Sequence, residues 1–266
     1  MTSFTKTRIG TSGWTYDSWR GRFYPADVAK HDWLAWYASK LASTEINGSF
    51  YRTPSEEAVR NWRRQTPRDF IFAWKASQFI THWKRLKETC ANSIALMESR
   101  VRLLGTKAGP ILFQLPGNFQ ADRDRLARFI DMLPPRRRYA FEFRHQSWYE
   151  DYILDLLTTN NVSLCLSDHH LAPSPWVATA AHVYVRGHGP GGRYRGNYPD
   201  ATLCKWARHI EIWEREQRRV FIFFDNDQKS AAPADAARLA ALLERNTSRA
   251  IAPGAAPRPA RARTIA

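Results

Sequence analysis

Short apolar runs alternate along the chain with longer segments in which apolar residues recur every three or four positions. The short runs are typical of buried β-strands, and the longer segments are typical of amphipathic helices. The expected strands cover residues 8–11, 44–47, 69–75, 109–115, 139–144, 162–167, 182–186 and 219–225. The same pattern therefore repeats along most of the chain.

Helices are expected between most of these strands. They cover residues 31–42, 55–65, 88–104, a segment that begins at residue 122, and residues 147–159, 201–217 and 233–245. Ser55 and Asp122 are suited to cap the helices that they begin, and Pro233 suits a first helical turn. Leu96 and Val101 should face inward from the third of these helices.

Strands that alternate with helices predict a parallel sheet, and eight such strands are the number that closes a TIM barrel. We therefore expect an α/β protein with a single (β/α)8 TIM barrel in residues 1–245, with a doubly wound open sheet as the alternative. The connection 168–181 is short and rich in proline, so the barrel should be irregular around its sixth strand. Residues 246–266 are rich in alanine, proline and arginine and are expected to form a disordered basic tail.

The 266 residues carry a formal net charge of +15. Five arginines from Arg245 onward contribute +5, which leaves about +10 on the rest of the chain. A basic body attracts anions, such as phosphorylated metabolites, nucleic acid or an anionic surface. Many of the 11 tryptophans have arginine or lysine nearby, which fits either helix–sheet seams or stacking platforms beside cations.

Cys90, Cys165 and Cys204 are far apart and form no CxxC motif, so neither a disulfide framework nor a metal finger is expected. The first residues lack the apolar core of a signal peptide. No run approaches the ~20 apolar residues of a membrane span. We therefore expect a soluble, reduced, cytoplasmic protein with no membrane partner.

Residues 139–148, with the sequence YAFEFRHQSW, show the polar pattern on which the functional hypothesis depends. Side chains alternate between the faces of a strand, so Phe141 and Phe143 share one face while Glu142 and Arg144 share the other. Other expected strands also end in unlike polar residues, and the carboxyl ends of barrel strands form the active site. The polar residues at these ends are Ser12, Glu45, Asn47, Tyr51, Arg52, Lys75, His82, Gln114, Glu142, Arg144, His145, Asp168, Arg186, His188, Asp225 and Asn226.

Three kinds of site fit these residues. The first is an anion site, formed by Arg52, Lys75, Arg144 and Arg186. The second is an acid–base or hydrolytic site, formed by Glu142, His145, Asp168 and His188. The third is a metal site of histidines and carboxylates, for which no HxH or HExxH spacing exists. The structural alternative is a salt-bridge network that closes the top of the barrel, because inward charges need partners.

The sequence GHGPGG at residues 187–192 follows the seventh strand. Loops after the seventh and eighth strands of a barrel often hold phosphate. The segment matches neither a Walker A nor a dinucleotide pattern. A phosphate loop, a mobile lid and a plain glycine-rich turn therefore stay open.

Several motifs together point to one family. They are GTSGW at 10–14 with WRG at 19–21 and FYP at 23–25, EIN at 45–47 with SFYR at 49–52, Lys75 with ITH at 80–82, FQLP at 113–116, EFRH at 142–145 with SW at 147–148, Arg186 with HG at 188–189, and FDND at 224–227. Over roughly residues 8–245 the chain resembles the YecE-like family, also called domain of unknown function 72. The resemblance implies a TIM barrel similar to those of endonuclease IV and xylose isomerase, and no established reaction. Its motifs include Trp14 and Trp148, which we add to the expected ligand-binding residues.

The preferred hypothesis is a protein that binds or acts on a small anionic ligand at the carboxyl end of the barrel. Glu142 and His145 are the first choices for proton transfer, with Asp168 and His188 as further choices. A hydrolase, a lyase and an isomerase all fit such a site, and the metal and the cofactor stay undetermined. The alternative is a nucleic-acid-binding or nuclease-like protein, motivated by the net charge and by the similarity to the endonuclease IV type of barrel.

Overall fold

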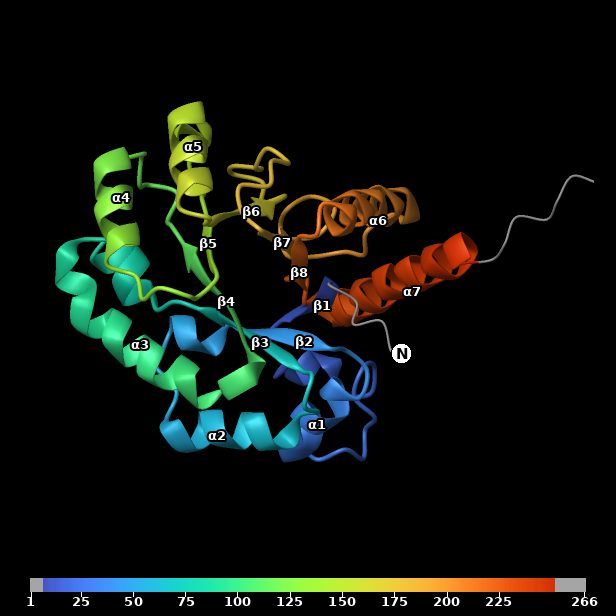
Figure 1. Cartoon of the computed structure of the whole chain (residues 1–266). Coiled ribbons are helices and arrows are strands. Elements are labelled where there is room, and N and C mark those ends of the chain that lie inside the picture. The colour runs from blue at the N-terminus through green and yellow to red at the C-terminus, as the bar shows by residue number, and fades with distance from the viewer. Residues whose placement is uncertain (1–6, 252–266) are drawn as a thin grey trace, which may run out of the picture.

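Eight parallel strands close into a barrel in the computed structural model, which describes residues 7–251 (Figure 1). The strands are β1 (Thr7–Ser12), β2 (Ser43–Ile46), β3 (Ile71–Lys75), β4 (Ala108–Gln114), β5 (Tyr139–Glu142), β6 (Ser163–Ser167), β7 (His182–Gly187) and β8 (Arg219–Phe224). Each strand pairs with the next one along the chain, and β8 pairs with β1 to complete the ring. The expected TIM barrel is confirmed, and the open doubly wound sheet is wrong.

Helices surround the strands on the outside of the barrel (Figure 1). They are α1 (Trp33–Ala38), α2 (Glu56–Gln65), α3 (Ala91–Leu103), α4 (Arg123–Asp131), α5 (Asp151–Thr159), α6 (Asp200–Arg215) and α7 (Ala231–Ile251). The Ser55 side chain accepts a hydrogen bond from the Ala58 amide, and the Asp122 side chain accepts one from the Arg125 amide. Both helix caps expected from the sequence are therefore present.

The inner and outer faces of the barrel carry different side chains because strand residues alternate in direction. Outward residues such as Phe113, Phe141 and Phe224 belong to the main apolar core, which the strands share with the helices. The inward residues at mid-height form a second, smaller apolar cluster, which consists of Ala73, Leu112, Ala140, Cys165, Tyr184, Phe221 and Phe223. The next inward positions toward the carboxyl ends are mostly polar, so the polar site lies on an apolar floor.

The connection between β6 and β7 contains no helix, as its prolines indicate. Hydroxyl groups hold it against β6 instead. The Ser174 hydroxyl accepts a hydrogen bond from the Ser167 amide (2.9 Å). The Thr179 hydroxyl accepts one from the Leu164 amide (2.7 Å) and donates one to the Val162 carbonyl (2.8 Å). These side chains satisfy backbone groups that would otherwise be buried without partners.

The buried face of α3 differs from the expected one. Leu96, expected to face inward, is 44% exposed. The buried stripe of this helix runs through Ile94, Met97 and Val101, which recur at helical spacing, and Leu96 lies to one side of it. The expected inward position of Leu96 is therefore wrong, whereas that of Val101 is confirmed.

Helix boundaries also differ from those expected. The segment 147–159 is divided into a short 3-10 turn, η7 (Gln146–Tyr149), and α5, because Glu150 between them has an extended backbone. The last helix reaches Ile251, so residues 246–251 of the expected tail are helical. Residues 252–266 of that tail lie outside the described residues.

Candidate functional site

Arg186 of β7 lies at the centre of a polar network at the carboxyl end of the barrel and is fully enclosed. Its guanidinium donates hydrogen bonds to Glu45 Oε1, Glu142 Oε2 and Asp225 Oδ2, each at 2.9 Å. It also donates to the Ser12 hydroxyl (2.9 Å), which in turn donates to Glu45 (2.5 Å). Side chains from β1, β2 and β5, and one that directly follows β8, therefore meet at this guanidinium.

Arg144 extends the network beyond the end of β5. Its Nη2 lies 2.6 Å from Glu142 Oε1, and its Nη1 donates to the Tyr194 hydroxyl (2.9 Å). Burial by itself would raise the pKa of Glu142, but Arg144 and Arg186 hold that pKa well below its usual range. Glu142 is therefore an ionised hydrogen-bond acceptor near neutral pH.

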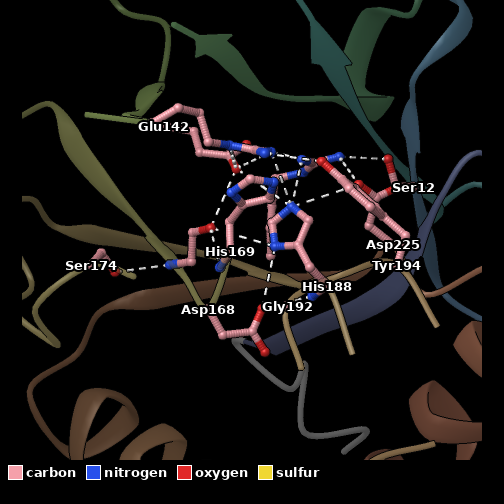
Figure 2. A network of polar contacts seen from close by, with 12 residues as sticks. Ser12, Glu142, Asp168, His169, Ser174, His188, Gly192, Tyr194 and Asp225 are labelled. Atoms are coloured by element: carbon pink, nitrogen blue, oxygen red, sulfur yellow. Dashed lines mark hydrogen bonds and ion pairs between the residues drawn. The ribbon is translucent and has the colours of Figure 1, made fainter. Parts of the chain in front are cut away.

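His188 connects the two arginines to Asp168. Its Nε2 lies 3.2 Å from Arg144 Nη2 and 3.1 Å from Arg186 Nη1, and its Nδ1 lies 3.2 Å from Asp168 Oδ1. Because guanidinium nitrogens only donate hydrogen bonds, this geometry places the His188 proton on Nδ1, facing Asp168. Asp168 also accepts from the Tyr198 hydroxyl, which fixes the carboxylate from its other side. Figure 2 shows the His188 ring between Asp168 and Glu142.

The glycine-rich segment after β7 folds back over His188. Gly189 has a φ of +91°, and a Cβ there would lie 2.4 Å from a backbone carbonyl oxygen. Gly192 has a φ of +65°, and a Cβ there would also lie 2.4 Å from a carbonyl oxygen. Both positions require glycine, and the turn between them brings Tyr194 against Arg144. The expectation of a phosphate or a mobile lid at this segment stays a prediction.

Lys75 is the inward residue at the carboxyl end of β3 and is only 6% exposed. Its Nζ has no carboxylate oxygen within 4.0 Å among residues 7–251 and lies 4.6 Å from the centroid of the Phe50 ring. Burial, followed by the charge of Arg186, lowers the pKa of Lys75 to about 8. Lys75 therefore differs from Arg144 and Arg186, which are paired with carboxylates.

His82 is half-buried in the helical turn η4 (Phe79–Trp83) and packs edge-on against Phe50, with ring centroids 5.1 Å apart. Burial is the largest cause of the lowering of the His82 pKa to about 4. The positive charges of Lys75, Arg144 and Arg85 act in the same direction. The surroundings of this imidazole are therefore electrically positive.

His145 and Trp148, which were expected at the site, lie outside the network. His145 Nδ1 accepts a hydrogen bond from the Ser147 amide (3.2 Å) and caps η7. Trp148 stacks on Phe143 with centroids 4.8 Å apart, and its Nε1 donates to the Phe119 carbonyl (2.6 Å). Trp148 therefore belongs to the outer core, and the contacts of His145 are local ones to Ser147.

Trp14 and Asn226 also have structural contacts. Trp14 packs against Trp62 (5.3 Å) and Phe72 (6.4 Å) in the outer core. The Asn226 amide donates to Asp235 (2.8 Å) and so ties the loop after β8 to α7. Neither side chain joins the polar network within the described part of the chain.

The remaining expected residues surround the network. Tyr51 is 69% exposed and lies beside Arg52 in the loop after β2. Gln114 ends β4 opposite Glu142 in the strand register. Asn47 follows β2, and its Oδ1 is enclosed without a hydrogen-bond partner among residues 7–251. The structure thus places these side chains at the rim of the barrel.

Several members of the site have no counterpart among the expected residues. Ser167 donates to Glu142 Oε1 (3.3 Å), and its inward position follows from alternation with the buried Cys165. Tyr194 and Phe50 come from loops, where no periodic pattern reveals the direction of a side chain. Strand alternation could therefore have identified Ser167 but neither of the two aromatic residues.

Among the described residues, no group of three or more histidine, cysteine, aspartate or glutamate side chains is placed to hold a metal ion. None of the helices between residues 7 and 251 combines the length and the apolar character that a membrane crossing needs. The cytoplasmic location stays a prediction.

Residues 8–261 match the family described as protein of unknown function DUF72. The chain belongs to the DUF72 family. The UPF0759 protein YunF of Bacillus subtilis strain 168 is 25% identical over 269 residues, which cover 89% of this chain and 94% of YunF. The UPF0759 protein YecE of Escherichia coli K12 is 32% identical over 114 residues, or 42% of each protein. The resemblance stated from the motifs is therefore confirmed.

Solved structures of the DUF72 family share the fold. TM1631 of Thermotoga maritima matches with a TM-score of 0.81 and 25% identity, covering 90% of this chain and 99% of its own. EF0366 of Enterococcus faecalis matches with a TM-score of 0.75 and 20% identity, which concerns the fold alone. The family description assigns no function, so a function for this DUF72 protein is inferred from the chemistry of its site.

Proposed function

We propose that this DUF72 protein binds a small ligand with a carboxylate or phosphate group at the carboxyl end of the barrel, beside Lys75 and Arg144. The observation that carries the proposal is the state of Lys75, a buried cation with no carboxylate oxygen within 4.0 Å among residues 7–251, although Glu45, Asp225 and Glu142 act on it from farther away. A buried charge without a partner is unfavourable. An incoming anion therefore gains an attraction that the described part of the chain leaves unused.

The positive surroundings of His82 support the same ligand class. Lys75, Arg144 and Arg85 all act on this imidazole, although they come from three different segments. Converging positive charge beside a low-dielectric wall raises the local concentration of anions. Arg85, whose guanidinium donates to the neutral Asn118 side chain, also offers a planar group that suits a carboxylate or phosphate.

Lys107 is a second buried lysine of the chain, and its contacts are structural. It is buried as well, but its Nζ donates to the carbonyls of Arg63 and Thr66, at 2.6 Å each, and to the Thr66 hydroxyl at 2.9 Å. It lies immediately before β4, at the amino end of the barrel. Lys107 therefore serves as the matched control for Lys75.

Thermal unfolding with inorganic phosphate, lactate, pyruvate and sugar phosphates, each compared with NaCl at equal ionic strength, tests the proposal. A ligand at ten times its Kd should raise Tm by about 3–6 °C. Lys75→Met should remove this shift, whereas Lys107→Met should keep it relative to its own ligand-free Tm. An equal shift in the Lys75→Met variant, or no anion that exceeds NaCl, would contradict the proposal.

A second function is supported by exposed aromatic residues on the same rim. Tyr51 and Trp83 are 69% and 68% exposed, and Arg52 and Lys84 follow them directly in the sequence. Aromatic faces beside cations are the stacking platforms of single-stranded nucleic acid binders. We keep nucleic-acid binding as the alternative. Unlike the first proposal, it requires these rim residues, and the affinity should depend strongly on salt.

A further inference from the structure

We propose that Lys75 forms an imine with the carbonyl group of an anionic ligand, such as a 2-oxo acid or an aldehyde acid. This inference rests on the proposed anion site and names the ligand class. An arginine is enough where only a counter-charge for a carboxylate is needed, and Arg144 provides one for Glu142 at this end of the barrel. Lys75 adds an amine, which arginine does not supply, at the end of a barrel where active sites form.

The position of Lys75 Nζ suits attack on a ligand. The Phe50 ring covers one side of the ammonium group. Within residues 7–246, whose side chains the structure describes, Lys75 Nζ makes no hydrogen bond, so its donors stay available to a ligand.

A lysine reacts with a carbonyl only as the neutral amine, and burial or a neighbouring cation favours that form. The charged groups around Lys75 are Arg186 from β7, Glu45 from β2, Glu142 from β5 and Asp225 after β8. Burial first, and then Arg186, lowers the pKa of Lys75 to about 8, although the carboxylates act in the opposite direction. At pH 7 its neutral fraction is then roughly 100-fold or more above that of an exposed lysine.

The covalent step balances without any further reagent. The lone pair of Lys75 Nζ attacks the carbonyl carbon and forms a C–N bond, while the π electrons of the C=O bond move to oxygen. Proton transfer from nitrogen to oxygen gives a carbinolamine. A second proton goes to that oxygen, which leaves as water as the nitrogen lone pair forms the C=N bond. One amine, one carbonyl and one proton thus give one iminium ion and one water.

Neighbouring side chains supply what this step requires. Arg85, whose guanidinium donates to the neutral Asn118 side chain, is the cation that can pair with the ligand carboxylate. His82, which packs on the same Phe50 ring, is neutral near pH 7 because its pKa is lowered to about 4, so it can carry the protons. An iminium withdraws electrons from the adjacent carbon, which is the chemistry of a lyase or an isomerase.

Reductive trapping tests the inference on the full chain. The protein is incubated at pH 7 with glyoxylate or pyruvate and sodium cyanoborohydride, which adds hydride to an iminium carbon, and the labelled lysines are identified by peptide mass spectrometry. Lys75 should be labelled at least about tenfold faster than exposed lysines such as Lys40, since far more of it is neutral. Lys107, whose amine is hydrogen-bonded, should stay unlabelled. Lactate, which carries a hydroxyl in place of the carbonyl, should slow the labelling of Lys75 by competition.

The outcomes separate this inference from the anion site. Lys75→Arg keeps a cation, so lactate should still raise its Tm. In this variant, pyruvate together with cyanoborohydride should raise Tm no more than pyruvate alone does. If lactate and pyruvate raise the Tm of the natural protein but Lys75 is labelled no faster than Lys40, the imine is overturned and the anion site stands. If neutral propanal labels Lys75 as fast as glyoxylate and no anion raises Tm, the anionic ligand class is overturned.

Discussion

Glu142 keeps its charge in a fully enclosed position because Arg144 and Arg186 both contact its carboxylate. The same enclosure would make an isolated carboxylate protonate or become exposed. Breaking a buried pair by removing one partner costs more than the pair itself contributes, because the other charge remains buried. At the scale of the residue, the network is therefore sensitive to any single neutralisation.

Glu142→Gln should destabilise the folded protein by about 3–5 kcal/mol at pH 7, because both arginines lose their shared anion. The pKa of Glu142 is lower in the folded than in the unfolded chain. Its contribution is therefore complete above about pH 4.3, the unfolded value, and declines as the pH falls below that value. Urea unfolding of both proteins between pH 3 and pH 8 measures this difference.

The exposed carboxylate of Glu57 provides the control for this measurement. Glu57→Gln should change the free energy of unfolding by less than about 0.5 kcal/mol at every pH. A difference between the natural protein and Glu142→Gln that grows as the pH falls would contradict the assignment of Glu142 as an ionised partner of the arginines.

In the β6–β7 connection, hydrogen bonds from side-chain hydroxyls take the place of a helix. The Thr179 hydroxyl bonds to the Leu164 amide and to the Val162 carbonyl, and it is buried. Next to it, the pairing of β5 with β6 extends over only Ala140 with Ser163 and Phe141 with Leu164. This part of the barrel therefore depends on loop hydroxyls more than the well-paired β7–β8 edge does.

Thr179→Val should destabilise the protein by about 1–3 kcal/mol, because it leaves a buried amide and a buried carbonyl without partners. Thr179→Ser, which keeps the hydroxyl, should lose less. Thr158→Val on the exposed face of α5 removes a hydroxyl that bonds only to the Leu154 carbonyl and should change stability by less than about 0.5 kcal/mol. Chemical denaturation of the three variants measures their free energies of unfolding. Equal decreases for Thr179→Val and Thr158→Val would refute the prediction.

Charge is a property of the whole molecule, and its net value of +15 attracts any polyanion. Non-specific attraction of this kind falls steeply with salt and does not depend on particular aromatic residues. Binding through the rim aromatics Tyr51 and Trp83 would depend on the salt concentration and also on these two side chains. The two kinds of association can therefore be separated.

Under the nucleic-acid alternative, replacing Tyr51 and Trp83 together with alanine should weaken binding of a single-stranded oligonucleotide at least about fivefold at ~50 mM NaCl, because each stacked base is lost. Tyr152→Ala on α5, which removes a side chain that is 48% exposed, should leave the affinity unchanged. Fluorescence anisotropy at several salt concentrations gives both comparisons. Absence of binding at ~50 mM NaCl, or equal effects of the rim and α5 substitutions, would remove the alternative.

Strand positions and inward directions could be predicted because alternation is local. Alternation with Phe141 and Phe143 places Glu142 and Arg144 together on the other face of their strand. The loop residues could not be placed in this way. His145 and Trp148 follow Arg144 in the sequence, yet His145 caps the short turn η7 and Trp148 packs into the outer core.

The sequence by itself determined the alternation of eight strands with helices, which favours a barrel, while the pairing of β8 with β1 in the structure excluded the open sheet. It also determined which charges point inward, because successive side chains alternate between faces. Only the tertiary structure decided how those charges combine, since the pairing of Arg186 with Glu45, Glu142 and Asp225 joins segments far apart in the chain. That closure also leaves Lys75 with no carboxylate oxygen within 4.0 Å among residues 7–251, because the nearby carboxylates are engaged by the arginines.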